Sequence, residues 1–385
     1  INQSLVGGVE EAAKHPEIEN LYGAVHGVAG MAKDDFIDLK KLSAEELELV
    51  AASPSSALGS SRDKPDEEYC ARILEVFKKR NIRYFFYIGG NDSANTAYIV
   101  NTMAAKAGYE LRAFHIPKTV DNDLLVTDHC PGYGTAAKFV ACALTGDDLD
   151  NRALPGVKID VIMGRHAGFL TAASALGKQR DDDGPHLLYF PERPVSIDKF
   201  IADIDAVYKK LSRCVVAVSE GLSDADGVTY AKKLAEKAET DAHGNIQLSG
   251  TGALADFLAN QVRNNLKIKR VRADTFGYLQ RSFAGLQSDV DAREARWCGR
   301  HAVQYATQDD ADSGSVAIKR LGTGKEYKVE LFRTELANVA EKTKSLPAEY
   351  IDAEGNNVTQ TFIDYAMPLT GGLPKTHYLG GYPRA

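Results

Sequence analysis

The segment Pro-Lys-Thr-Val-Asp-Asn-Asp at residues 117–123 combines side chains that could do chemistry together. It places a lysine, a hydroxyl and two carboxylates in one short loop after an apolar run. Asp121 and Asp123 stand two positions apart and could point to the same side, one accepting a proton and one facing a metal ion. Lys118 could neutralise a phosphoryl group during its transfer. The alternative is a turn held by Asx hydrogen bonds, which explains the acids and the amide but not the lysine.

A second candidate is the segment Gly-Gly-Asn-Asp-Ser at residues 89–93, which joins an apolar run to a predicted helix. Glycines let the backbone approach an anion, and a helix N-terminus supplies N–H donors and a partial positive charge. The segment therefore predicts a phosphate site that includes Gly89, Gly90 and Ser93. The alternative is that Asp92 or Ser93 only caps the helix.

Three arginines are candidates for binding a phosphate, because the guanidinium group can hold two phosphate oxygens at once. Arg165 follows Met163 and Gly164 after one apolar run, and Arg281 ends the segment Tyr-Leu-Gln-Arg at residues 278–281 after another. Arg272 lies within that second run. Isolated arginines more often form surface ion pairs, which is the alternative for each of them. Together with the lysine and the carboxylates, they match the cationic stabilisation that phosphoryl transfer requires.

Glu220 follows the apolar run 214–219 and could accept hydrogen bonds from sugar hydroxyls, although it could also cap a helix. His115 and His166 are interpreted as structural residues. Neither has a serine or cysteine nucleophile beside it, and neither has the spacing of a metal ligand.

All five polar clusters follow predicted strands, and these strands alternate with amphipathic helices. This order predicts an α/β protein with parallel sheets, in which ligands bind at the carboxyl ends of the strands. The expected strands cover residues 20–25, 82–88, 111–116, 157–163, 214–219 and 270–276, and the expected helices include 1–14, 65–80 and 93–107. Residues 223–250 are polar and predict an exposed excursion.

Composition limits the partners and the compartment. With 385 residues the chain is long enough for two domains, and its net charge of −7 disfavours nucleic acid and anionic membranes as partners. No apolar run approaches the length of a membrane span, and no signal segment opens the chain. The five scattered cysteines are expected to be reduced packing residues. These features favour a cytoplasmic protein.

Five motifs occur in the order and approximate spacing of the phosphofructokinases, which the chain resembles over residues 1–310. They are GGNDS, PKTVDND, MGRHAG, SEG and GYLQRS, together with Leu-Gly-Ser-Ser-Arg at residues 58–62. The resemblance implies two Rossmann-like three-layer α/β/α domains with the active site in the cleft between them. It implies a donor domain at 1–125 plus about 285–385 and a sugar-phosphate domain at about 126–284. It also implies that a first strand and a Gly-Gly phosphate loop precede residue 1.

The resemblance assigns roles to the motif residues. Asp121 would take the proton from the 1-hydroxyl of fructose 6-phosphate, and Arg62 would lie on the donor side. Arg272 matches an arginine that family members lend across a subunit interface, which implies a homodimer or homotetramer. The family usually has aspartate where this chain has Asn91, so Asn91 and Asp123 are the candidate ligands for Mg²⁺. The residues that would line the sugar-phosphate site are Thr119, Val120, Asp121, Met163, Gly164, Arg165, Glu220, Arg272, Tyr278, Leu279, Gln280 and Arg281.

Two positions resemble the pyrophosphate-dependent branch, because ATP users in this family tend to have glycine where this chain has Asp92 and Lys118. A carboxylate at position 92 would repel the α-phosphate of ATP, whereas Lys118 can balance the charge of a compact pyrophosphate. We therefore expect reversible phosphoryl transfer from pyrophosphate to fructose 6-phosphate in glycolysis or gluconeogenesis. The alternatives are an ATP-dependent enzyme and a non-catalytic regulatory binder of the same fold. A dinucleotide oxidoreductase is disfavoured, because no G-x-G-x-x-G follows a strand.

Overall fold

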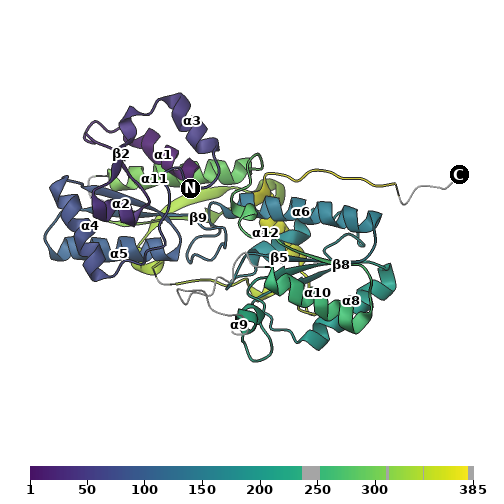
Figure 1. Cartoon of the computed structure of the whole chain (residues 1–385). Helices are drawn as coiled ribbons and strands as arrows, with labels where there is room; N and C mark the ends of the chain where they lie inside the picture. The colour runs from purple at the N-terminus through teal and green to yellow at the C-terminus, as the bar shows by residue number, and fades with distance from the viewer. Residues whose placement is uncertain (236–251, 309–311, 341, 380–385) are drawn as a thin grey trace. The chain divides into compact units, whose positions relative to one another are not determined.

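The computed structural model describes residues 1–235, 252–308, 312–340 and 342–379 (Figure 1). These residues form two compact units. Unit 1 comprises Ile1–Tyr133 and Asp289–Lys344, and unit 2 comprises Gly134–Ser288 and Ser345–Ala385. Each unit contains one four-stranded sheet, and a separate two-stranded sheet is formed by β1 and β2.

The sheet of unit 1 has the strand order β10-β9-β4-β3, in which β3, β4 and β9 are parallel and β10 is antiparallel. Successive residues of β4 pack against helices on opposite faces. Ala113 lies in a core with residues of α4 and α5, whereas Phe114 lies in a core with residues of α11. The elements are α1 (Asn2–Ala12), β1 (Tyr22–Ala24), α2 (Val28–Lys33), β2 (Phe36–Asp38), α3 (Ala44–Ala52), α4 (Glu67–Lys79), β3 (Tyr84–Gly89), α5 (Asn91–Lys106), β4 (Arg112–Pro117), α11 (Asp289–Ala306), β9 (Gly314–Arg320) and β10 (Val329–Thr334).

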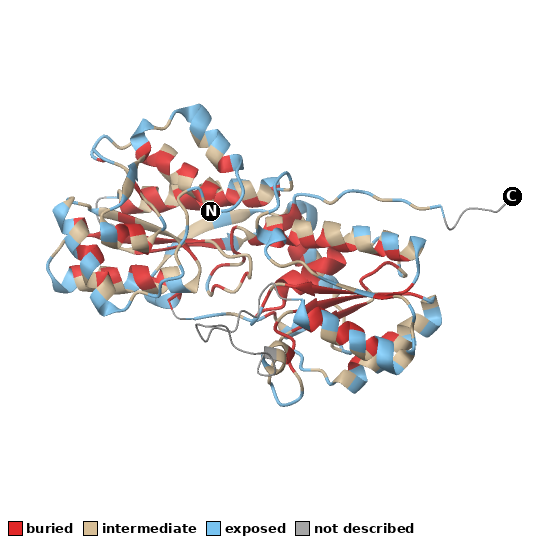
Figure 2. Ribbon diagram, viewed as in Figure 1, coloured by how far each residue is buried: buried red, intermediate tan, exposed pale blue. Residues whose placement is uncertain are grey.

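The sheet of unit 2 is entirely parallel, with the order β6-β7-β5-β8. Strands β5, β6 and β7 are almost completely buried, because helices cover both faces (Figure 2), whereas the edge strand β8 exposes Arg272 and Asp274. Ile159 and Val216 pack toward α8 and α10, and α6 lies on the opposite side of the sheet in Figure 1. The elements are α6 (Tyr133–Ala153), β5 (Val157–Ile162), α7 (Phe169–Ala173), β6 (Leu187–Tyr189), α8 (Ile197–Leu211), β7 (Cys214–Ser219), α9 (Tyr230–Ala235), α10 (Ala253–Leu266), β8 (Val271–Thr275) and α12 (Gln360–Ala366).

The α/β class and all six predicted strands are confirmed, as are the three predicted helices. The strand at 20–25 is β1, but it pairs antiparallel with β2 outside both large sheets. Residues 236–250 of the predicted excursion lie outside the described residues, as do residue 251 and residues 380–385. Among the described residues, no helix is both long enough and apolar enough to cross a membrane.

The C-terminal segment differs from the predicted domain division. Residues 345–385 group with unit 2, whereas the sequence placed them with the first domain. The reason is packing. The ring of Tyr365 in α12 lies 6.3 Å from that of Phe169 in α7, and Ser288 Oγ donates a 2.6 Å hydrogen bond to the carbonyl of Leu369.

The five cysteines are free thiols, and all except Cys142 are buried. Burial raises the pKa of the Cys70 thiol to about 11 and that of Cys130 to about 12, so these thiols stay protonated. The four buried cysteines are therefore confirmed as packing residues.

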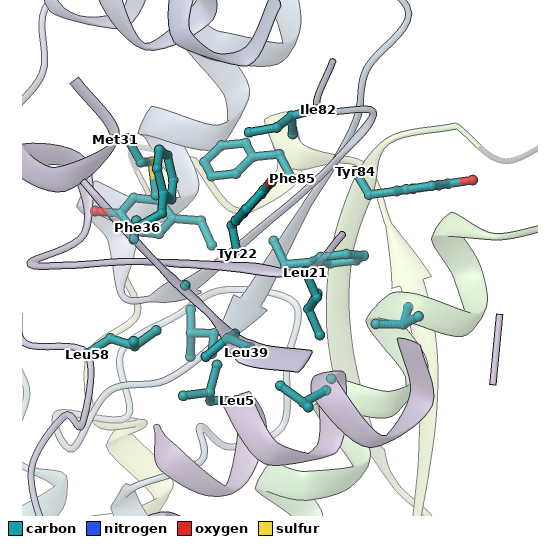
Figure 3. A pocket seen from close by; sticks show the side chains of 18 of the residues that line it. Leu5, Leu21, Tyr22, Met31, Phe36, Leu39, Leu58, Ile82, Tyr84 and Phe85 are labelled. Carbon is teal, nitrogen blue, oxygen red and sulfur yellow. The ribbon is translucent and has the colours of Figure 1, made fainter. Parts of the chain in front are cut away.

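An apolar cavity of about 530 Å³ lies beside β3, which is an edge strand of the unit 1 sheet. Leu5 of α1, Tyr22 of β1 and Phe85 of β3 are among the residues that line it (Figure 3). An edge strand offers backbone groups to a further strand. The upstream strand implied by the resemblance stays a prediction.

Candidate active site

The glycine turn after β3 is fixed by close packing. A Cβ atom on Gly89 would lie 2.0 Å from Ser93 Oγ, so a side chain does not fit at that position. Gly90 is the N-cap of α5, and no side chain makes a capping hydrogen bond. The capping alternative for Asp92 and Ser93 is therefore wrong. The Asp92 side chain is 73% exposed in the first turn of α5, with its carboxylate 3.8 Å from Lys64 Nζ.

Parallel pairing of β3 with β4 brings this turn beside the loop that follows β4. Gly89 is paired with Pro117, and the backbone N–H of Lys118 donates a 2.9 Å hydrogen bond to the carbonyl of Gly89. A Cβ atom on Gly90 would lie 3.8 Å from Thr119 Cβ. The two segments that the sequence predicted to bind a phosphate donor and to carry the base are thus neighbours in unit 1.

Two residues of the loop 117–123, Thr119 and Asn122, make hydrogen bonds that stabilise the conformation of this loop. Thr119 Oγ1 accepts a 3.2 Å hydrogen bond from the N–H of Asp121. Asn122 is buried in a left-handed conformation with φ of 60°, and its Oδ1 accepts a 2.8 Å hydrogen bond from the N–H of Cys130. Thr119 and Asn122 therefore have the role that the alternative interpretation gave to the loop, namely a turn held by side-chain hydrogen bonds. The flanking Asp121 and Asp123 are both half-buried.

Asn91 and Asp123 fit a divalent cation. Asn91 Nδ2 donates a 3.2 Å hydrogen bond to Asp123 Oδ2. Asn91 Oδ1 is buried and accepts no hydrogen bond from any described residue. A buried oxygen without a donor, next to a carboxylate, is a suitable ligand for Mg²⁺. The residues present thus match the chemistry that a Mg²⁺ site requires.

A second acidic group lies in unit 2, where carboxylate oxygens of Asp147, Asp160 and Asp274 are within 4.8 Å of one another. Lys158 Nζ lies 3.3 Å from Asp160 and 3.4 Å from Asp147, and it also contacts Asp274. This ammonium group already supplies a positive charge to the acids. Asn91 and Asp123 stay the metal ligands predicted from the sequence.

Four of the sugar-site candidates converge after β5 and β7 in unit 2. The N–H of Gly164 faces Glu220 Oε1 at 3.5 Å, and Arg165 Nε lies 3.6 Å from the same oxygen. The N–H of Met163 donates a 3.3 Å hydrogen bond to Gln280 Oε1. The Arg165 side chain is 56% exposed, whereas that of Glu220 is only 15% exposed. The next described helix begins at residue 230, so Glu220 does not cap a helix.

Arg281 and Tyr278 form a cation–π contact, in which the guanidinium carbon of Arg281 lies 4.5 Å from the centroid of the Tyr278 ring. Tyr278, Leu279 and Arg281 are exposed. Arg272 lies elsewhere: it is opposite Lys158 in the register of β8 with β5, toward the amino ends of these strands. Within one chain, Arg272 and Arg165 therefore lie toward opposite ends of the sheet of unit 2.

The remaining candidates are placed as follows. Arg62 is exposed in the segment before α4, and Val120 is half-buried in the loop after β4. His115 is buried, with its ring nitrogens 2.8 Å from Ser315 Oγ and 2.9 Å from the carbonyl of Gly89. Burial lowers the pKa of His115 to about 4, so its structural role is confirmed. His166 is exposed.

Several supporting residues were missed from the sequence. Ser219 Oγ donates a 2.6 Å hydrogen bond to the carbonyl of Gly164, and Asp291 Oδ1 accepts one of 2.7 Å from the N–H of Gly132. Ser219 stands directly before Glu220, so its position at the end of a strand was a usable signal. Asp291 lies 159 positions from its partner, and no local pattern connects the two.

Comparison with known proteins agrees with this arrangement. The phosphofructokinase family model matches residues 1–306. The chain is 56% identical over 380 residues to the pyrophosphate–fructose 6-phosphate 1-phosphotransferase of Rhodospirillum rubrum, covering 98% of this chain and 93% of that protein. It is 36% identical to the protein of the same name from Halomonas elongata, covering 100% of this chain and 92% of the relative.

A solved structure gives the same result. The crystal structure of a pyrophosphate-dependent phosphofructokinase from Marinobacter aquaeolei superposes with a TM-score of 0.85 at 33% identity, covering 100% of this chain and 91% of that one. The motif residues, both sheets and these similarities agree, and the chain belongs to the phosphofructokinase family.

Proposed function

We propose that this chain transfers a phosphoryl group from pyrophosphate to the 1-hydroxyl of fructose 6-phosphate, forming fructose 1,6-bisphosphate and phosphate. The observation that carries the proposal is the fixed contact between two segments of unit 1. One is the glycine turn that leads to Asp92, and the other is the loop with Lys118 and Asp121. The 56% identity to the Rhodospirillum rubrum protein supports pyrophosphate as the donor.

In the proposed reaction the Asp121 carboxylate accepts the proton of the 1-hydroxyl while that oxygen attacks a phosphorus atom of pyrophosphate. The new O–P bond forms as the bridging P–O bond breaks, and inorganic phosphate leaves with the electron pair of that bond. Lys118 balances negative charge on the transferring group. The turn at Gly89 and Gly90 supplies backbone N–H groups and the N-terminal end of α5 for the donor phosphates.

Mg²⁺ would be held by Asn91 and Asp123, and it would supply charge neutralisation for the phosphate oxygens. Unit 1 would then be the donor unit. In unit 2, Arg165 and Arg281 would bind the 6-phosphate, and Glu220 would accept hydrogen bonds from sugar hydroxyls.

We predict that Arg165→Ala and Arg281→Ala each raise the KM for fructose 6-phosphate by about 10- to 100-fold, because each removes a charge-assisted contact to phosphate. Steady-state kinetics at saturating pyrophosphate measure this effect. Arg263→Ala is the matched control, since Arg263 is exposed on α10 and bonds to Asn260 and Val271. Unchanged KM values in both variants would show that the sugar-phosphate pocket is misplaced.

Assembly into a homodimer or homotetramer belongs to the same proposal, with Arg272 supplied by the neighbouring subunit. We predict that mixed oligomers of Arg272→Ala chains and Asp121→Asn chains regain activity. One interface then combines an intact Asp121 with a donated intact Arg272. Differently tagged chains purified by both tags show that hybrids have formed. Hybrids with no activity above that of either parent would contradict a shared site.

A coupled assay with fructose 6-phosphate, Mg²⁺ and either pyrophosphate or ATP tests the function directly. Turnover with pyrophosphate and little turnover with ATP is the expected result. The reverse preference would identify an ATP-dependent enzyme. Absence of turnover together with fructose 6-phosphate binding would identify a regulatory binder.

A further inference from the structure

A buried ionic network lies directly behind the loop that carries Asp121, and the proposed chemistry does not use it. His129 is at its centre, with a side chain only 3% exposed. Its Nδ1 lies 2.8 Å from Asp128 Oδ2, and its Nε2 lies 2.7 Å from Glu294 Oε2 on α11. The Glu294 side chain is 1% exposed.

This geometry requires a charged histidine. A neutral imidazole has one N–H and one lone pair, so it would present the lone pair to one of the two carboxylates. Only the imidazolium can donate to Asp128 and Glu294 together. Burial would lower the pKa of His129, but the hydrogen bonds to the two carboxylates outweigh burial and raise it above the ordinary value.

The partners of His129 are themselves fixed. Arg320 of β9 donates to both oxygens of Asp128 at 3.0 to 3.1 Å, and the Tyr327 hydroxyl donates to Glu294 Oε1 at 2.9 Å. Burial would raise the pKa of Asp128, yet the hydrogen bonds from His129 and Arg320 lower it to about 2. The titratable and charged groups around His129 are Asp128, Cys130, Glu294, Cys298, Arg320, Tyr327 and Lys344.

Hydrogen bonds of the neighbouring backbone connect this network to the loop that carries the proposed base. Cys130, directly after His129, donates its N–H to Asn122 Oδ1 at 2.8 Å, and Asn122 is directly after Asp121. The N–H of Thr119 donates to the carbonyl of Pro131 at 3.2 Å, and Thr119 forms a parallel bridge with Gly132. The two ends of the loop are therefore joined, and a shift at His129 would move Asp121.

We infer that the His129 imidazolium is a positioning residue for the phosphoryl transfer: by donating to Glu294 of α11 and to Asp128, it fixes the loop that carries Asp121. This inference rests on the proposed function. It predicts a loss of turnover when His129 loses its charge, because a base displaced by about 1 Å can cost about a hundredfold in rate.

The expected pH dependence follows from the sign of the shift. The stabilising contacts are complete while His129 is protonated, and they are lost as the pH rises through its raised pKa. The kcat of the wild type should therefore fall on the alkaline side.

Glu294→Gln is the decisive variant, because the amide oxygen can still accept a hydrogen bond from Nε2 while the negative charge is removed. The alkaline fall in kcat should move to lower pH by roughly one to three units. Tyr327→Phe is the matched control. It removes a neutral hydroxyl from Glu294 and leaves both carboxylates, so it should not move the alkaline fall to lower pH.

His129→Gln gives the second readout. At neutral pH its kcat should fall by about 10- to 100-fold, with KM values for both substrates within about twofold of the wild type. Its alkaline fall should disappear. If circular dichroism and thermal unfolding show that His129→Gln does not fold, the nearly isosteric Glu294→Gln still tests the role of His129.

The outcomes separate the two proposals. A wild type that does not turn over fructose 6-phosphate and pyrophosphate contradicts the proposed function. An active wild type whose alkaline fall is unmoved in folded Glu294→Gln overturns the role of His129 and leaves the proposed function intact. A shift to lower pH in Glu294→Gln but not in Tyr327→Phe supports it.

Discussion

Replacing Asp121 by asparagine is expected to lower kcat by about 10²–10⁴-fold, because the variant has no group to accept the proton of the 1-hydroxyl. The fold should be retained, since the amide is close in size to the carboxylate and position 121 is only half-buried. Binding of fructose 6-phosphate should change little. Rapid-quench or coupled kinetics with pyrophosphate, combined with equilibrium binding of the sugar phosphate, measure both effects.

Asp123→Asn provides the comparison, because Asp123 is a proposed metal ligand rather than the base. Part of its defect should be relieved by a higher Mg²⁺ concentration, whereas that of Asp121→Asn should not. Near-normal turnover of Asp121→Asn would contradict the assignment of Asp121 as the base.

The donor preference is expected to change when Asp92 is replaced by glycine. Under the proposed function, pyrophosphate would end near this carboxylate, whereas ATP would have to extend past it with an α-phosphate. Two like charges about 4 Å apart repel by roughly 1 kcal/mol in water, which corresponds to about fivefold, and steric overlap adds to this. Asp92→Gly should therefore raise the ratio of kcat/KM for ATP to that for pyrophosphate by about 10- to 100-fold.

The double variant Asp92→Gly with Lys118→Gly should shift the ratio further, because Lys118 then no longer favours the compact donor. Asp92→Asn is the matched control for volume: it removes the charge but keeps the bulk, so it should give a smaller change than glycine. Steady-state kinetics with both donors across these variants decide the question. If the wild type prefers ATP, or if Asp92→Gly leaves the ratio unchanged, position 92 does not select the donor.

Local patterns were sufficient to predict the strands. The runs 82–88 and 214–219 are short and apolar, and they became β3 and β7 within one or two residues. Their polar ends were also predictable, because a parallel strand that ends in glycine and acids before a helix is a local feature. The same reasoning did not assign β1 to its own small sheet, since three residues give too little pattern to choose a partner.

The alternatives for individual residues were resolved only by contacts. Asp92 and Ser93 had the right residue types for a cap, yet Gly90 holds that position and no side chain caps the helix. Asn122 fits the turn alternative, because its amide oxygen accepts a hydrogen bond from the N–H of Cys130. Residue type restricts what a side chain can do, and its neighbours determine what it does.

The sequence by itself determined the α/β class and the family, and it supplied the residues proposed as reactive in each motif, because these depend on side-chain chemistry and on short-range spacing. The tertiary structure decided which motifs meet within a unit: the glycine turn lies against the loop of Lys118, and Arg165 lies against Glu220. It also revealed that His129 bonds to Glu294, 165 positions away. Such pairs depend on how parallel strands and helices pack after distant segments come together, and no local period in the sequence encodes that packing.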